Sequence, residues 1–250
     1  MNNASTTQTK DQHRLVKSLL LHITPGALVT VAFILLKQLL DSTDYPPLLA
    51  FLLAVLLVDI PFMVGVMLKE GKKLNGHTGL KGVVLYREKI SWKTFAWVFV
   101  AAFIVLYLLI MLSSPINSVL AERGFSWLPD WFFLDNADMY EGYSKNVLVF
   151  VFTLHLLITG ILLPWVEELY FRGYLMPRIA RYKNWTPIIS GLLFGLYLSW
   201  QMFGFVGVSL LGAGLASVVW WKKDIRLSIS LHVFANTLIR VFLLFSILAM

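Results

Sequence analysis

Seven long apolar runs, most of them separated by polar segments, make up most of the chain. They cover residues 19–40, 48–68, 94–112, 146–176, 187–203, 204–221 and 227–250. A helix needs about 20 apolar residues to cross the hydrocarbon layer of a membrane, and most of these runs reach or approach that length. The pattern therefore predicts an all-α fold, a polytopic transmembrane helical bundle with about seven spans.

Charged residues fall between the apolar runs and predict how the bundle is oriented. Segment 69–93 has seven Lys or Arg residues and two Glu residues, whereas segment 113–145 has five acidic and two basic residues. Loops rich in Lys and Arg stay on the cytoplasmic side of a membrane. We therefore expect the N-terminus inside, the C-terminus outside, and segment 113–145 on the outer face with an interfacial helix near residues 127–134.

These expectations divide the chain into a cytoplasmic tail at 1–18, three N-terminal spans at 19–112 with a basic cytoplasmic loop at 69–93, an outer loop at 113–145 and a core of four spans at 146–250. The chain is 58% hydrophobic and 14% charged, with a mean hydropathy of +0.74, which is typical of a multispanning membrane protein. Its net charge of +7 comes from basic residues at membrane boundaries. The expected partner is therefore the lipid bilayer, and no nucleic acid.

An ionisable cluster lies at the end of the fourth apolar run, in the stretch WVEELYFRG at 165–173. Each charged side chain in a membrane costs at least ~2.5–3.5 kcal/mol, so such a cluster needs internal partners or a function. Glu168 and Arg172 are four residues apart on a helix and can form an ion pair. Glu167 is rotated about 100° from them and can face another group. Pro164 lacks a backbone N–H, so we expect a kink or a helix restart just before Glu167.

A second polar group lies in the last apolar run, where His232 and Asn236 are four residues apart and share a helix face. Counting about 1.5 Å per residue from the expected inner helix ends, Glu167 lies about 14 Å deep and His232 about 12 Å deep. The two side chains can therefore face each other across a polar cavity, which we expect to open toward the cytoplasm. A carboxylate and an imidazole can activate water, and a carboxamide can donate to an oxyanion, so this set predicts amide hydrolysis.

Two further charged residues lie within apolar runs. Arg240 continues the helix face of His232 and Asn236, and Asp59 lies alone in the second run. We expect a structural role for both residues. Each should pair with a polar group, and Arg240 and Asp59 could pair with each other, although their estimated depths along the helices differ by about 9 Å.

Three motifs in the core resemble those of one family. They are EE-x-x-x-RG at 167–173, FGL at 194–196 and H-x-x-x-N at 232–236. Over about residues 146–236 the chain resembles the CPBP family, the bacterial relatives of the CAAX prenyl endopeptidases. The resemblance implies an intramembrane endopeptidase of a bacterial cell membrane that acts on a membrane-associated peptide or protein. It also implies that Glu167 is the base, His232 a water or metal partner and Asn236 the oxyanion donor, with Glu168 and Arg172 in support.

The middle motif departs from the family pattern. The family has F-x-x-x-H, and the fourth residue after Phe194 is Leu198 instead of histidine. Gln201, three residues further on, can lie near the same helix face and orient a water. His155 precedes Glu167 by twelve residues, about 18 Å of helix, and is an unlikely substitute.

The residues leave three functions open. The first is an endopeptidase that needs no cofactor, or that binds a divalent metal such as zinc through Glu167 and His232, which is fewer than the three protein ligands usual for catalytic zinc. The second is a non-catalytic scaffold or immunity protein that binds a partner. The absence of the motif histidine at Leu198 favours this function. The third, a transporter, is weaker because the sequence shows no inverted repeat or pair of interrupted spans.

Overall fold

The computed structural model describes residues 12–134 and 136–250, and helices make up most of this part of the chain. Residues 1–11 of the predicted tail and Asp135 of the predicted outer loop lie outside the described residues. The N-terminal helices are α1 (Leu15–Leu40), α2 (Pro47–Ala54), η1 (Val55–Asp59), α3 (Ile60–Asn75), α4 (Trp92–Val119) and η2 (Leu120–Gly124). The helices that follow are η3 (Asp130–Phe132), η4 (Ala137–Tyr140), α5 (Lys145–His155), η5 (Leu156–Leu162), α6 (Leu163–Glu167), η6 (Glu168–Leu175), η7 (Met176–Trp185), α7 (Thr186–Tyr197), η8 (Ser199–Gly204), α8 (Phe205–Lys222) and α9 (Ile225–Ala249).

Six helical stretches in the described chain are long and apolar enough to cross a membrane. They are Leu15–Leu40, Pro47–Asn75, Trp92–Gly124, Lys145–Tyr197, Ser199–Lys222 and Ile225–Ala249. The prediction of an all-α polytopic bundle is confirmed, and the chain is an integral membrane protein. In the stretch Trp92–Gly124, which contains α4, only 6% of the most apolar segment is buried inside the protein. Most of the surface of α4 therefore faces lipid.

The difference between six stretches and about seven expected spans lies at Lys145–Tyr197, which contains two passes. The chain reverses within η7, where Ile179 and Lys183 leave helical geometry, the latter with φ 51° and ψ −124°. The returning helix α7 has 12 residues, about 18 Å, and ends where Leu198 adopts φ −73° and ψ 54°. The predicted span 187–203 is therefore a short helix followed by the tight turns of η8.

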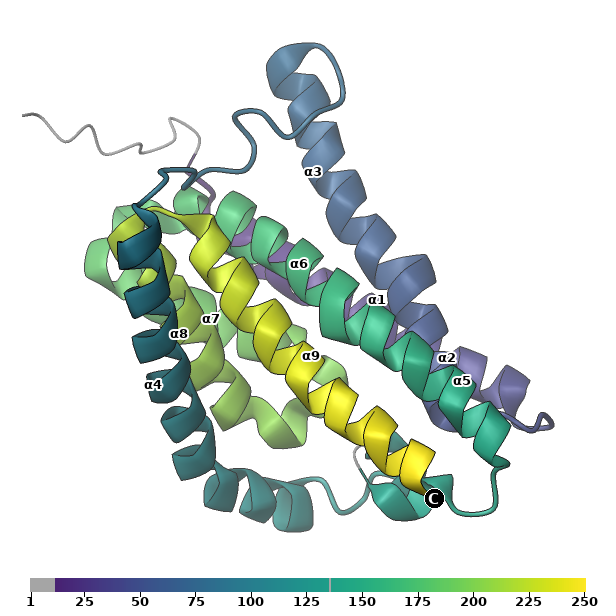
Figure 1. Ribbon diagram of the computed structural model, residues 1–250. Coiled ribbons are helices and arrows are strands. Elements are labelled where there is room, and N and C mark those ends of the chain that lie inside the picture. The colour runs from purple at the N-terminus through teal and green to yellow at the C-terminus, as the bar shows by residue number, and fades with distance from the viewer. Residues whose placement is uncertain (1–11, 135) are drawn as a thin grey trace, which may run out of the picture.

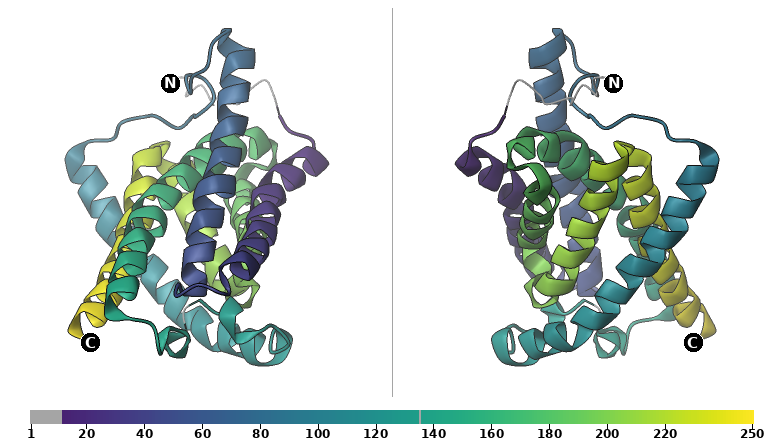
Figure 2. Two further views of the ribbon diagram at one scale, coloured as in Figure 1. Left: turned by 90° about the vertical axis from the view of Figure 1, so that its right-hand side faces the viewer. Right: turned by 90° about the vertical axis from the view of Figure 1, so that its left-hand side faces the viewer.

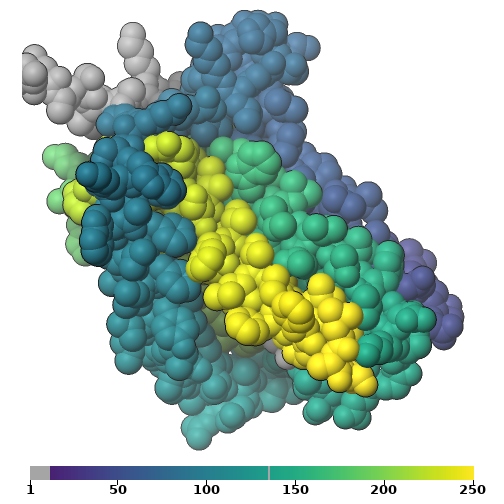
Figure 3. Space-filling view, in the orientation of Figure 1, coloured from purple at the N-terminus to yellow at the C-terminus, as the bar shows by residue number. Residues whose placement is uncertain are grey.

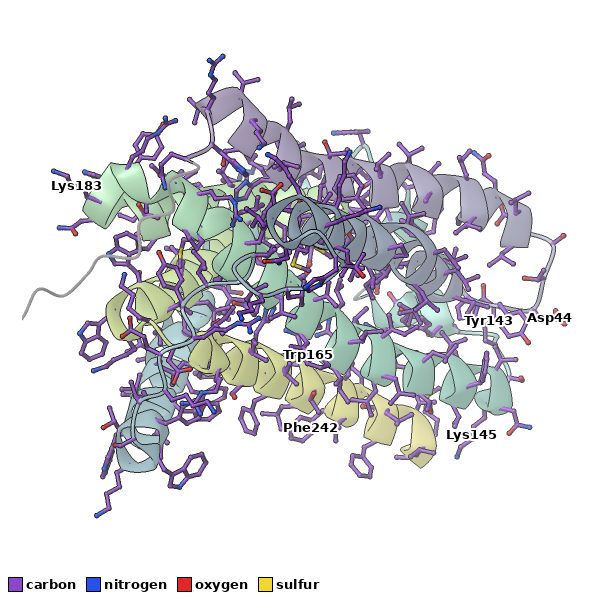
Figure 4. The ribbon with its side chains drawn as sticks, turned by 90° about the horizontal axis from the view of Figure 1, so that it is seen from above. Asp44, Tyr143, Lys145, Trp165, Lys183 and Phe242 are labelled. Atoms are coloured by element: carbon purple, nitrogen blue, oxygen red, sulfur yellow. The ribbon has the colours of Figure 1, made fainter. Side chains whose placement is uncertain are left out.

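The ends of the bundle match the predicted separation of charge. In Figures 1 and 2, α3, the turn before α7 and the start of α9 lie at one end, and η2, η3, η4 and the C-terminus lie at the other. Figure 4 places Lys183 at the end opposite Asp44, Tyr143 and Lys145. The basic boundaries thus share one end. Which end faces the cytoplasm stays a prediction.

Two loop regions differ in detail from the expectation. At 127–134, where we expected an interfacial helix, the structure has only the three-residue 3₁₀ helix η3, and a second short 3₁₀ helix, η4, follows it. The basic segment is partly helical, because α3 continues to Asn75 instead of ending near residue 68. Lys72 and Lys73 therefore lie in its last turn, where positive charge interacts favourably with the helix dipole.

The helix that carries the two glutamates is irregular on both sides of them. It widens into π-helical turns at η5, returns to α geometry at α6 with Pro164 in its first turn, and widens again at η6. This is the restart that Pro164 predicts. Such π turns are often found at functional sites.

Close helix packing fixes the end of α7. A Cβ atom added to Gly26 of α1 would lie 1.7 Å from the carbonyl oxygen of Tyr197, so only glycine permits this approach. The Tyr197 ring packs against Phe171, Phe194 and Trp200, with centroid distances of 4.7, 5.7 and 5.2 Å. The last residue of α7 is thus held rigidly at the centre of the bundle.

Candidate functional site

A buried ion pair forms the base of the site. The Glu168 Oε1 atom lies 3.0 Å from Arg172 Nη1, and both side chains are fully buried. The guanidinium also donates to the carbonyl oxygen of Gly212 over 3.2 Å and lies 4.2 Å from the ring centre of Phe194. This is the ion pair that the four-residue spacing predicts. It neutralises one of the two adjacent glutamates.

The same carboxylate orients His232, which α9 contributes from across the bundle. His232 Nδ1 lies 2.9 Å from Glu168 Oε1. Since an ionised carboxylate only accepts hydrogen bonds, Nδ1 is the donor, and a neutral imidazole then has an unprotonated Nε2. This Nε2 lies 3.8 Å from Glu167 Oε2. The structure thus brings Glu167 and His232 together, and Glu168 fixes the tautomer of the imidazole.

Glu167 is the last residue of α6, and its side chain turns inward from a helix whose opposite face meets lipid. Glu167 is buried, whereas Trp165, two residues earlier, is 51% exposed. Figure 4 places Trp165 and Phe242 along the α6 and α9 side of the bundle. In Figure 3 the side chains of α9 form part of the front surface between α4 and α5. The site therefore lies directly behind this face of the molecule.

The phenol of Tyr197 contacts Glu167 and connects it to a second carboxyl group, that of Asp59, and neither residue was among the expected site residues. The Tyr197 hydroxyl lies 3.0 Å from Glu167 Oε1 and 2.5 Å from Asp59 Oδ2. We expected Asp59 to have a structural role, with Arg240 as one candidate partner, and the structure pairs Asp59 with Tyr197 instead. The signal in the sequence was the cost of an isolated carboxylate in a membrane, which marks such a residue as a candidate for function.

Glu167 and His232 lie on the wall of a cavity of about 770 Å³. Asn236 lines it and donates from Nδ2 to the carbonyl oxygen of His232 over 3.1 Å, which leaves its second amide hydrogen for another acceptor. Leu198 and Gln201 also line the cavity. Leu198 therefore does not close the space in front of the Glu167 and His232 side chains.

The cavity opens in a direction that we did not expect. Its lining continues past His155 and Arg240 to Asp138 and Met250. Those last residues belong to the acidic loop and to the end of α9, so the cavity opens toward the acidic end of the bundle and not, as we expected, toward the basic end. The loop helices η3 and η4 fold beneath the bundle and form the mouth. His155, expected to be remote from Glu167, lines the same cavity.

The donor set does not fit a catalytic metal. Within 12–134 and 136–250, no group of three or more His, Cys, Asp and Glu side chains is arranged to hold a metal ion. Glu167 Oε2 and His232 Nε2, 3.8 Å apart, are two candidate ligands, whereas catalytic zinc usually takes three protein ligands. The arrangement instead suits a water held between a carboxylate and an imidazole.

Comparison with protein families gives one match. Residues 149–238 match the family model described as Type II CAAX prenyl endopeptidase Rce1-like. The matched segment contains the six residues selected from the sequence, which are Glu167, Glu168, Arg172, Gln201, His232 and Asn236. It also contains Tyr197, but not Asp59. No curated protein and no solved structure shows significant similarity to the chain.

Proposed function

We propose that the protein is an intramembrane endopeptidase of the CPBP type, because residues 149–238 match the family model described as Type II CAAX prenyl endopeptidase Rce1-like. Its substrate is a peptide bond of a membrane-associated protein or peptide, and its membrane is a bacterial cell membrane. The observation that carries the proposal is the pair formed by Glu167 Oε2 and His232 Nε2, which lie 3.8 Å apart on a cavity wall. A water about 2.8 Å from both atoms fits this spacing.

The proposed reaction uses that water. Glu167 Oε2 takes one proton as the water oxygen bonds to the carbonyl carbon, and His232 Nε2 accepts the other water hydrogen and orients the nucleophile. The free amide hydrogen of Asn236 donates to the oxyanion that develops. When the C–N bond breaks, the proton on Glu167 passes to the leaving nitrogen. Neither a cofactor nor a metal takes part in this scheme.

The route of the substrate follows from the shape of the cavity. With the basic boundaries on the cytoplasmic side, the cavity mouth near Asp138 and Met250 lies on the outer side of the membrane. We therefore propose that the peptide reaches Glu167 from the outer leaflet. Its apolar residues would contact the cavity wall, which is mostly hydrophobic.

A cleavage assay tests the function. Purified protein in lipid vesicles is incubated with a library of membrane-tethered peptides, beside Glu167→Gln, His232→Ala and, as a matched control, Glu122→Gln at an exposed position. We expect cleavage by the wild type and the control, and a loss of about 10²–10⁴-fold in Glu167→Gln because the base is removed without a change of shape. Equal cleavage by Glu167→Gln and wild type would rule the mechanism out.

The alternative is a non-catalytic scaffold or immunity protein that binds a partner, and Leu198 favours it because an apolar side chain stands where the family motif has histidine. The assay separates the two functions through Leu198→His. If the wild type cleaves nothing while Leu198→His gains activity, the fold has kept the site and lost the reaction. The partner is then sought by crosslinking from the cavity wall.

A further inference from the structure

The contact chain from Asp59 through Tyr197 to Glu167 contains more acceptors than hydrogens. The Tyr197 oxygen lies within hydrogen-bond distance of Asp59 Oδ2, at 2.5 Å, and of Glu167 Oε1, at 3.0 Å. A phenol has a single hydrogen and can donate to only one of these carboxyl oxygens at a time. The other contact therefore needs a hydrogen that the carboxyl group supplies. One of the two carboxyl groups carries a proton.

Burial and charge assign this proton to Asp59. The Asp59 side chain is fully buried, its Oδ1 has no hydrogen-bond partner, and no ion pair reaches it within the described chain. The buried guanidinium of Arg172 already pairs with Glu168. An ionised Asp59 would be a second uncompensated charge beside Glu167, at a cost of several kcal/mol. Glu167, in contrast, lines the cavity and lies near His232 Nε2.

We propose that Asp59 and Tyr197 position the catalytic base, an inference that rests on the proposed function. Protonated Asp59 donates to the Tyr197 oxygen, and Tyr197 donates to Glu167 Oε1. This arrangement holds Glu167 ionised and leaves its Oε2 atom directed at the water site beside His232. Tyr197 and Asp59 are thus positioning residues, since they act through Glu167.

The packing of Tyr197 supports this role. Rings on three sides and the backbone of α1 at Gly26 fix the phenol, so its hydroxyl cannot turn away from Glu167 without a shift of helices. Its position in the chain is also informative. Tyr197 directly precedes Leu198, where the family motif has histidine, so orientation of the base comes from the neighbouring residue and from a helix outside the matched segment.

The first test does not depend on activity. Infrared difference spectra of the protein in lipid, recorded in light and heavy water, report the carbonyl stretch of a buried protonated carboxyl group. We expect one such band that survives in Glu167→Gln, disappears in Asp59→Asn and moves to higher wavenumber in Tyr197→Phe, because the acid then loses its acceptor. Tyr170→Phe is the matched control, since the buried Tyr170 hydroxyl donates to the carbonyl oxygen of Leu21 over 2.8 Å. Absence of the band, or its persistence in Asp59→Asn, overturns the assignment.

The second test uses the cleavage assay. Tyr197→Phe keeps the ring and removes a hydrogen bond to a charged group, so kcat should fall about 10- to 100-fold while KM changes little. Asp59→Asn still donates through its amide and should lose far less activity than Asp59→Leu, which cannot donate. Tyr170→Phe should retain wild-type kcat. Wild-type kcat in Tyr197→Phe, or equal losses in Asp59→Asn and Asp59→Leu, overturns the positioning role. If the wild type cleaves no peptide, the proposed function fails, whereas the infrared result still decides the hydrogen-bond chain.

Discussion

Removal of the fully buried cation Arg172 should destabilise the protein far more than removal of Lys37, a partly buried cation in an ion pair of the same spacing. Arg172→Met keeps the length of the side chain and leaves Glu168 ionised without its guanidinium. Both partners are fully buried and 3.0 Å apart. Loss of one member of a buried pair typically costs about 3–5 kcal/mol, because the remaining charge is uncompensated. The substitution also removes the hydrogen bond from the guanidinium to the carbonyl oxygen of Gly212, and measured costs of breaking a buried pair already include such losses.

The chain supplies a matched control for this prediction. Lys37 and Asp41 are also four residues apart on a helix and 2.6 Å from each other, but their side chains are 17% and 59% exposed. Pairs of this spacing that water reaches contribute about 0.3–0.5 kcal/mol, and Lys37 also lies 5.1 Å from the ring centre of Trp131, so Lys37→Met should cost about 1 kcal/mol, far less than Arg172→Met. The free energy of unfolding is measured for both variants by reversible denaturation in mixed micelles.

A double-mutant cycle separates the lost ion pair from other effects of the substitution. Glu168→Gln combined with Arg172→Met leaves no buried charge in the pair and should recover a large part of the loss. The reasoning is refuted if Arg172→Met costs no more than Lys37→Met, or if Glu168→Gln adds its full cost to that of Arg172→Met.

Three further predictions concern packing, orientation and pH. Gly26→Ala should destabilise by about 1–3 kcal/mol in the same denaturation assay because α1 must move away from the end of α7, whereas Gly65→Ala, with no atom within 4 Å of the added Cβ, should be neutral or slightly stabilising. Since the chain has no cysteine, Thr78→Cys and Ser246→Cys can be labelled singly in intact cells, and an impermeant maleimide should label only Ser246→Cys if the N-terminus is inside. Burial alone would raise the pKa of Asp224, but hydrogen bonds from a neighbouring arginine side chain and from backbone N–H groups outweigh it and hold the pKa below its usual value. The stability that Asp224 contributes is therefore complete above the unfolded-state pKa of about 3.9 and is lost as the pH falls through the folded value, so Asp224→Asn should flatten the acid limb of a stability profile.

The apolar pattern predicted the helices well because hydrocarbon thickness sets their length. Runs at 19–40 and 94–112 correspond to helices at Leu15–Leu40 and Trp92–Val119. The pattern failed where geometry changes without a change of polarity. Leu198 leaves helical geometry within an apolar run, and the π turns on both sides of α6 have no signature in composition.

Contacts within one helix could be predicted, but contacts between helices could not. The Glu168 and Arg172 pair follows from a spacing of four residues. Tyr197 and Asp59 are 138 residues apart, and helical periodicity does not tell which of several apolar helices face each other. The same limit explains why the direction in which the cavity opens was predicted wrongly. The position of Glu167 along its own helix gives its depth, but the direction of opening depends on how the acidic loop packs against the other helices.

Under the proposed mechanism, the charge balance of the site explains how a chain without the middle-motif histidine can keep an ionised base. The site has three carboxyl groups, those of Asp59, Glu167 and Glu168, and Arg172 forms an ion pair with Glu168. If Arg172 neutralises Glu168 and a proton neutralises Asp59, a single negative charge remains, and it lies at Glu167 beside the cavity. A histidine at position 198 could supply either a hydrogen bond or a second positive charge. The phenol of Tyr197 supplies the hydrogen bond without the charge, so the base keeps its orientation while the cavity wall at Leu198 stays apolar and open to a hydrophobic peptide.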